Sequence, residues 1–156
     1  MIALFSASVL WVVLRRTNIT KRVAFTILIP YLFLVVASTI ITRRVRDDAH
    51  VILKPFWTIQ TILTGGQQKA WLLKEVILNI LMLLPVGLLA PALFEKRKLG
   101  KTMLLGCGIS ASIEISQLIT HRGYSEVDDI IYNMLGVLIG FGIYCVIKRR
   151  QNSAQQ

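Results

Sequence analysis

The chain has 156 residues, 54% of them hydrophobic, and its mean hydropathy is +0.63. This length allows one domain, and the composition is too apolar for an ordinary soluble protein. The formal net charge is +10. The basic residues form short clusters between apolar runs, which is typical of a membrane protein beside anionic lipid and argues against nucleic acid as a partner.

Five apolar segments follow one another along the chain, at residues 1–14, 23–41, 76–94, 102–120 and 130–147. A helix of roughly 20 residues crosses a bilayer, and the last four segments have that length. The first is shorter and needs its flanking residues, or a locally thinned bilayer, to cross. We therefore expect an all-α, polytopic membrane bundle of about five spans, with residues 1–156 forming a single membrane domain.

The Lys and Arg residues predict the topology. Eleven of them flank the segments on one side, at positions 15, 16, 21, 22, 96, 97, 98, 101, 148, 149 and 150, and seven lie on the other. The positive-inside rule places the eleven in the cytoplasm. We expect a multi-pass protein of the cell membrane with its N-terminus outside and its C-terminus in the cytoplasm. Six of the eight acids then fall on the outer side.

A long outer loop separates the second and third segments, at residues 42–75. Its part "HVILKPFWTIQTIL" is apolar, and Gly65 and Gly66 then break the chain. We interpret this stretch as an interfacial or re-entrant segment, with Trp57 and Trp71 as anchors at the level of the lipid headgroups.

Polar side chains interrupt three of the apolar segments. Glu114 and Gln117 share one helix face, Asp129 and Asn133 share another, and Asn79 lies on the third segment. Because lipid exposure of such groups costs free energy, we expect the five to converge on one site at the outer end. Each also has a structural interpretation. The amides can hold helices together, Asp129 can complement a helix dipole, and Glu114 can belong to a buried ion pair.

Two small-residue features predict packing rather than chemistry. Gly136 and Gly140 form a face that lets another helix approach closely. Cys107 and Cys145 lie within apolar runs and are interpreted as small buried hydrophobes. There is no Cys/His metal spacing, Walker loop or hydrolase nucleophile motif. No metal site is therefore named, and the cofactor stays unassigned.

Four motifs, in this order, resemble the VanZ-like family of bacterial membrane proteins. They are "LKPFWTI", "NILMLLPVGLLAP", "SIEISQ" and "RGYSEVDDIIYNMLGVLIG", within residues 50–144. Glu126 stands where many members carry Asp, so the charge is kept. The resemblance implies a small polytopic protein of the cell envelope. It also implies a connection with susceptibility to the glycopeptide antibiotic teicoplanin, because the founding member of the family is associated with resistance to it.

The sequence is compatible with three functions. The first is action on, or binding of, an anionic envelope lipid or lipid-linked cell-wall precursor at the outer face. The second is a non-catalytic binding or accessory protein, and the third a proton-coupled lipid flippase. In the enzyme hypothesis Glu114, with Asp128 or Asp129, would be general acid and base or would bind a divalent cation. The remaining candidate binding residues are Asn79, Gln117, Arg122, Glu126 and Asn133.

Overall fold

The computed structural model describes residues 19–41, 51–65, 69–96, 98–122 and 124–153. Its elements are α2 (Ile19–Val36), the π-helix η1 (Ala37–Ile41), β1 (Val51–Ile52), α3 (Trp57–Leu63), α4 (Lys69–Leu89), the 3-10 helix η2 (Ala90–Leu93), α5 (Lys98–Thr120), β2 (Ser125–Glu126) and α6 (Val127–Ser153). Within the described residues four stretches are long and apolar enough to cross a membrane: Lys21–Thr39, Lys69–Leu93, Lys98–Thr120 and Val127–Ser153. The expected helical bundle is confirmed, and the first expected segment, residues 1–14, lies outside the described residues.

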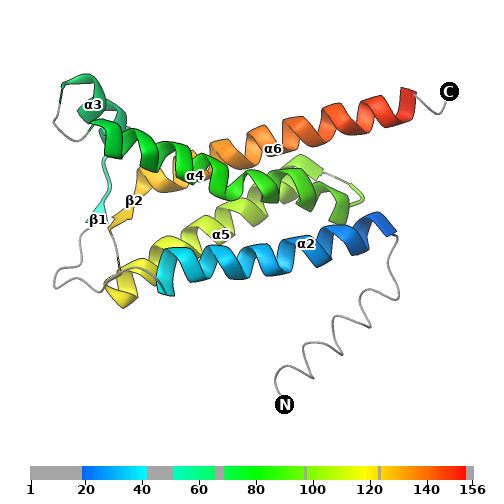
Figure 1. The fold of residues 1–156 in the computed structure, drawn as a ribbon, viewed down its shortest axis with the longest axis horizontal. Helices are drawn as coiled ribbons and strands as arrows, with labels where there is room; N and C mark the ends of the chain where they lie inside the picture. Colours follow the sequence, from blue (N-terminus) through cyan, green and yellow to red (C-terminus); the bar gives the residue numbers. More distant parts are fainter. Residues whose placement is uncertain (1–18, 42–50, 66–68, 97, 123, 154–156) are drawn as a thin grey trace, which may run out of the picture.

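The four long helices run up and down along a common direction (Figure 1). The ends of α2 and α5 and the beginnings of α4 and α6 lie together with α3 and the two short strands. We call this the acidic end, because it carries Glu75, Glu114, Glu126, Asp128 and Asp129. The opposite, basic end carries Lys21, Arg22, Lys96, Lys98, Lys101, Lys148, Arg149 and Arg150.

Helix α6 is longer than the apolar run that predicted it. It has 27 residues, which corresponds to about 40 Å, whereas the hydrocarbon core of a bilayer is about 30 Å thick. Asp128 and Asp129 in its first turn and Arg150 in its last turn complement the helix dipole. Hydropathy predicts only the part of the helix that lipid can cover. The backbone hydrogen bonds continue beyond it, so the helix includes charged residues at both ends.

Helices α4 and α6 pack with their backbones in contact. A Cβ atom added at Gly136 would lie 2.0 Å from the carbonyl oxygen of Ile80, and one at Gly140 would lie 2.1 Å from that of Leu84. Helix α4 contributes Gly87, where an added Cβ would lie 2.0 Å from the carbonyl oxygen of Val137. The predicted close approach at Gly136 and Gly140 is therefore confirmed, and α4 is the helix that approaches.

The apolar core lies beside this contact. Leu83, Val86 and Ala90 from α4 and η2 pack there against Val137 from α6, and all four are fully buried. The two cysteines do not join the core, because Cys107 and Cys145 are exposed on the surface of the bundle. That expectation was wrong for a physical reason: in a membrane helix an apolar side chain faces lipid as readily as protein.

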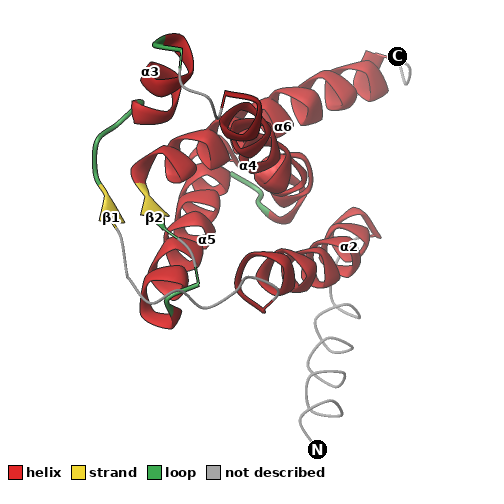
Figure 2. Ribbon diagram, turned by 60° about the vertical axis from the view of Figure 1, so that its left-hand side comes forward, coloured by secondary structure: helices red, strands yellow, loops and turns green. Residues whose placement is uncertain are grey.

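Helix α2 stands at the edge of the bundle, which is clearest in the turned view of Figure 2. The hydroxyl of Tyr31 donates to the carbonyl oxygen of Met82 on α4 at 2.7 Å. Near the basic end Lys21 pairs with Glu95 at 3.0 Å, and this hydrogen bond holds the pKa of the Glu95 carboxyl below its usual range. These contacts fix α2 to the α4–η2 part of the molecule.

Residues 51–65 of the long loop form an ordered segment at the acidic end. Strand β1 pairs in parallel with β2, with Val51 opposite Ser125 and Ile52 opposite Glu126. The short helix α3 follows and lies off the end of the bundle (Figures 1 and 2). The strand pairing determines where this segment lies beside the turn between α5 and α6, and its expected position at the membrane interface stays a prediction.

Candidate functional site

The turn between α5 and α6 is the centre of the acidic end. Helix α5 finishes with His121 in the left-handed conformation, at φ 52°. The N–H of Arg122 donates to the carbonyl oxygen of Gln117 at 3.0 Å, and that of His121 donates to Leu118 at 3.3 Å. These two bonds form a Schellman cap, in which glycine usually occupies the position of His121. The cap turns the chain back so that β2 and α6 can begin.

Asp128 holds the start of α3. Its Oδ1 accepts the backbone N–H of Phe56, and its Oδ2 accepts that of Thr58 at 2.9 Å. The Asp128 side chain is fully buried, and Phe56 is held at φ 60°. Hydrogen bonds from backbone N–H groups at a helix start stabilise a buried carboxylate, which would otherwise lose its hydration without compensation. Asp128 therefore acts as a cap for a helix about seventy residues earlier in the chain.

Two further acids form hydrogen bonds that stabilise the same turn. Glu126 Oε2 accepts the indole N–H of Trp57 at 3.1 Å. The N–H of Glu126 in turn donates to Glu114 Oε2 at 2.8 Å. Only 4% of the surface of Glu114 is exposed, so its carboxylate faces the protein, as its predicted position on an interior face requires. Glu114 thus links α5 to the beginning of α6.

Below this layer, towards the bundle centre, α5 and α6 share buried amides. Asn133 Nδ2 donates to the hydroxyl of Ser110 at 2.9 Å, and Gln117 Nε2 donates to the carbonyl oxygen of Thr39 at 3.3 Å. Thr39 lies in the π-helical turn that ends α2, where the backbone bonding pattern changes. The oxygens Gln117 Oε1 and Asn133 Oδ1 are buried and have no hydrogen-bond donor among the described residues. A polar ligand that reached this layer would therefore find two acceptors.

A polar cleft lies between the N-terminal part of α4 and the first turn of α6. The amide of Asn79 donates to Asp129 Oδ1 and joins α4 to the first turn of α6. Beside this pair lies a cleft of about 180 Å³. Its lining residues, which come from the first turns of both helices, are Trp71, Lys74, Glu75, Leu78, Asn79 and Asp129. The cleft thus has one cation, two carboxylates, an amide and an indole around one small volume.

The structure distributes the predicted site residues over three neighbouring places. Asn79 and Asp129 meet in the cleft, whereas Glu114, Glu126 and Asp128 hold the turn and α3. Gln117 and Asn133 form the buried amide layer. Of the five residues expected to converge, Asn79 and Asp129 share a hydrogen bond. Arg122 is half-buried beside the turn.

Sequence reasoning missed two parts of this region. The partners of Asp128 are backbone N–H groups of Phe56 and Thr58, and no side-chain pattern marks them. The α4 lining of the cleft did carry a signal. Its members recur at helical spacing, at positions 71, 74, 75, 78 and 79, and so lie on one face. A search for polar residues on one face of the helix start would have found Lys74 and Glu75.

The carboxylates at the centre of the acidic end accept backbone N–H groups. Both oxygens of Asp128 accept backbone N–H groups, and Glu114 accepts one. Over the residues that the structure describes, no three His, Cys, Asp or Glu side chains gather as metal ligands do. The cleft offers donors and acceptors to a charged or hydroxyl-bearing group.

Four apolar helices with a polar, acid-rich end define a polytopic α-helical membrane protein. The family model described as VanZ/LLP1 matches residues 23–148, which is most of the chain, and the chain belongs to this family. The resemblance found in the sequence motifs is thereby confirmed and extends to α2. Comparisons with curated proteins and with solved structures gave no match.

Proposed function

We propose that this protein binds an anionic, lipid-linked envelope precursor through the polar cleft at the acidic end, and that this end faces the outside of the cell. The single observation that carries the proposal is the composition of the cleft. Lys74 supplies a cation for a phosphate, and Glu75, Asn79 and Asp129 supply partners for hydroxyl or amino groups. Trp71 offers an aromatic surface at headgroup level.

The size of the cleft suits one headgroup rather than a whole lipid. Its volume of about 180 Å³ corresponds to roughly six water molecules at about 30 Å³ each. The apolar part of the ligand would remain in the bilayer against α4, where Leu73, Ile77, Leu78 and Leu81 are exposed. A lipid with a phosphate and a sugar-like head fits both requirements.

The contacts of the acids favour binding over catalysis. Asp128 and Glu114 already accept backbone hydrogen bonds that hold α3 and the α5–α6 turn, so we assign them to shaping the site. Asp129 and Lys74 are assigned to the ligand. A role in teicoplanin susceptibility, which the family resemblance implies, belongs to this proposal and would follow from sequestering a cell-wall precursor.

Lipids that copurify with the protein test the proposal. Polyprenyl-phosphate-linked sugars should be enriched with the wild type and should fall about tenfold with Lys74→Gln, because a hydrogen bond to a charged group contributes about 1.5 kcal/mol. Lys69→Gln is the matched control. It removes the same charge from the same helix but lies outside the cleft. Equal enrichment in both variants would refute the assignment of the cleft.

A second experiment distinguishes lipid binding from catalysis. Glu114→Gln keeps an oxygen that can accept the N–H of Glu126 and removes the carboxylate charge. Under the binding proposal the variant retains the copurified lipid and leaves the cellular lipid profile as in the wild type. A variant that folds and retains lipid, yet shifts the lipid profile towards an accumulated substrate, would favour the enzyme hypothesis instead.

A further inference from the structure

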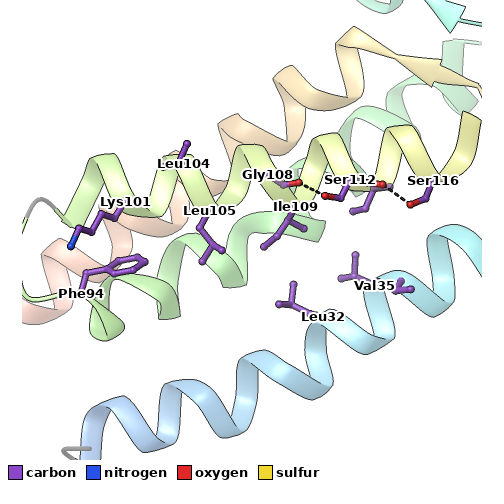
Figure 3. Close-up of a pocket in the computed structure, with 12 residues that line it drawn as sticks. Leu32, Val35, Phe94, Lys101, Leu104, Leu105, Gly108, Ile109, Ser112 and Ser116 are labelled. Atoms are coloured by element: carbon purple, nitrogen blue, oxygen red, sulfur yellow. Dashed lines mark hydrogen bonds between the residues drawn. The ribbon is translucent and has the colours of Figure 1, made fainter. Parts of the chain in front are cut away.

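A second, larger hollow lies between α2 and α5, away from the acidic cleft. It has a volume of about 750 Å³, within the range of ligand sites in proteins. From α2 it is lined by Leu32, Val35 and Val36, and from α5 mainly by Leu105, Ile109 and Ile113. Figure 3 shows Leu32 and Val35 facing Leu105 and Ile109 across the space between the two helices.

Helix α2 is held against the rest of the bundle at three places. Tyr31 donates to the carbonyl oxygen of Met82 on α4, Lys21 pairs with Glu95 towards the basic end, and Thr39 accepts the amide of Gln117 at the acidic end. On the α5 side, Gly108 lines the groove without a side chain. A Cβ added there would meet nothing within 4 Å. The middle of the groove is therefore open.

The groove is long, and its lining is mostly apolar. It extends along α5 from Lys101 to Ser116, which are sixteen residues and span about 22 Å along the helix axis. Its two serines donate to their own helix, Ser112 to Gly108 at 2.6 Å and Ser116 to Ser112 at 2.7 Å, as the dashed lines of Figure 3 indicate. A hydroxyl bonded in this way has no donor left for a ligand. The lining of the groove is therefore suited to a hydrocarbon chain along this length.

One end of the groove carries a positive charge. The Lys101 ammonium lies 5.7 Å from the centroid of the Phe94 ring, and both residues line the groove at its basic end (Figure 3). Lys21, Lys96 and Lys98 belong to the same end of the bundle. An apolar groove that finishes at an oriented ammonium matches an amphiphile with an anionic head.

From these observations we infer that the groove is a binding site for an anionic phospholipid, with one acyl chain between α2 and α5 and the phosphate at Lys101. A second copy of this chain is a poorer occupant. Two copies packed side by side in one orientation would bring their basic ends together, and like charges at such a contact repel. This site is independent of the headgroup cleft, which lies at the opposite end of the bundle.

The first test blocks the groove. The protein is purified from nanodiscs with equal phosphatidylglycerol and phosphatidylcholine, and the lipids it retains are counted by native mass spectrometry. Gly108→Leu should retain one phosphatidylglycerol fewer than the wild type. Gly142→Leu is the matched control, because a Cβ at Gly142 also meets nothing within 4 Å and Gly142 does not line the groove. Equal retention in both variants overturns the inference.

The second test removes the charge. Lys101→Gln should lower the preference for phosphatidylglycerol over phosphatidylcholine about fivefold, whereas Lys148→Gln at the same end should leave it within twofold. An unchanged preference in Lys101→Gln contradicts the placement of the phosphate.

A photo-crosslinking side chain at Leu105, which faces Leu32 and Val35 across the groove, reports the occupant. A lipid-sized mass increment supports the inference, and a dimer of the chain overturns it. Gly108→Leu should leave the copurified sugar lipid unchanged, so failure here is distinguishable from failure of the proposed function.

Discussion

At the scale of single residues, the acids of the α5–α6 turn act through backbone groups. Asp128 receives two N–H groups from the start of α3, and Glu114 receives one from Glu126. Removing the Asp128 carboxylate would leave its N–H partners without an acceptor, and each unsatisfied N–H costs about 1–3 kcal/mol. Asp128 is therefore the residue on which the order of the interfacial helix most directly depends.

Removing that carboxylate should release α3 locally. In Asp128→Ala we expect the amides of residues 53–64 to exchange hydrogen roughly 30-fold faster, which corresponds to about 2 kcal/mol of lost local stability. Hydrogen exchange followed by mass spectrometry measures this. Glu95→Gln, an exposed acid at the other end, should leave those amides unchanged. Unaltered exchange in Asp128→Ala would mean that the cap contributes nothing to α3.

His121 gives a prediction of opposite sign. A left-handed conformation costs a residue with a Cβ roughly 1 kcal/mol more than it costs glycine, and His121 is exposed at the end of α5. His121→Gly should therefore raise the thermal midpoint of the detergent-solubilised protein by a few degrees. Thr120→Gly, one residue earlier and still helical, should lower it. A fall in both variants would show that the imidazole itself is required at the turn.

At the scale of elements, the contact of α4 with α6 fixes the frame on which the acidic end is built. Gly87 from one helix and Gly136 and Gly140 from the other let backbone meet backbone. Any side chain inserted there must push the helices apart. Because Asn79 on α4 and Asp129 on α6 line one cleft, a change in the spacing of these helices also changes the cleft.

We expect Gly136→Ala to destabilise the protein by about 1–3 kcal/mol, the usual cost of overpacking, since the new Cβ would lie 2.0 Å from the Ile80 carbonyl oxygen. The fraction folded during a thermal ramp in detergent would report it. Gly142→Ala on the same helix meets open space and should be neutral or slightly stabilising. Matching midpoints for the two variants would contradict the observed helix contact.

At the scale of the whole molecule, charge separates the two ends of the bundle. The clusters of Lys and Arg next to α2, α5 and α6 share one end, and five acids share the other. The positive-inside rule predicts that the basic end is cytoplasmic. On that prediction the proposed headgroup cleft would face the outside, and the proposed phosphate site at Lys101 would lie at the inner leaflet.

Cysteine labelling in intact cells tests this orientation. In a background where Cys107 and Cys145 are serine, Thr64→Cys should react with an impermeant thiol reagent, and Gln151→Cys should react only after permeabilisation. The reverse pattern would invert the topology. Ile2→Cys, at the outer end of the span predicted for residues 1–14, tests that span, and labelling from outside would support an external N-terminus.

Much of this architecture could be predicted from the sequence, because lipid imposes strong rules. Four apolar runs predicted four helices, and the cost of placing Glu114 or Gln117 against lipid predicted their burial. The partners could not be predicted in the same way. Asp128 meets backbone N–H groups that every sequence contains, and their position depends on the strand pair β1–β2 and on the unusual conformation of Phe56.

The cap on α3 also sets an order of events during biosynthesis. Thr58 leaves the ribosome seventy residues before Asp128, which is about 4–14 s at translation rates of 5–20 residues per second. Over that interval α4 and α5 are still being synthesised, and the start of α3 has no carboxylate to bind. The acidic end of the protein is therefore completed last, when α6 is synthesised and brings Asp128 into place. A chain that stops after α5 would contain every residue of α3 and still lack the group that secures it.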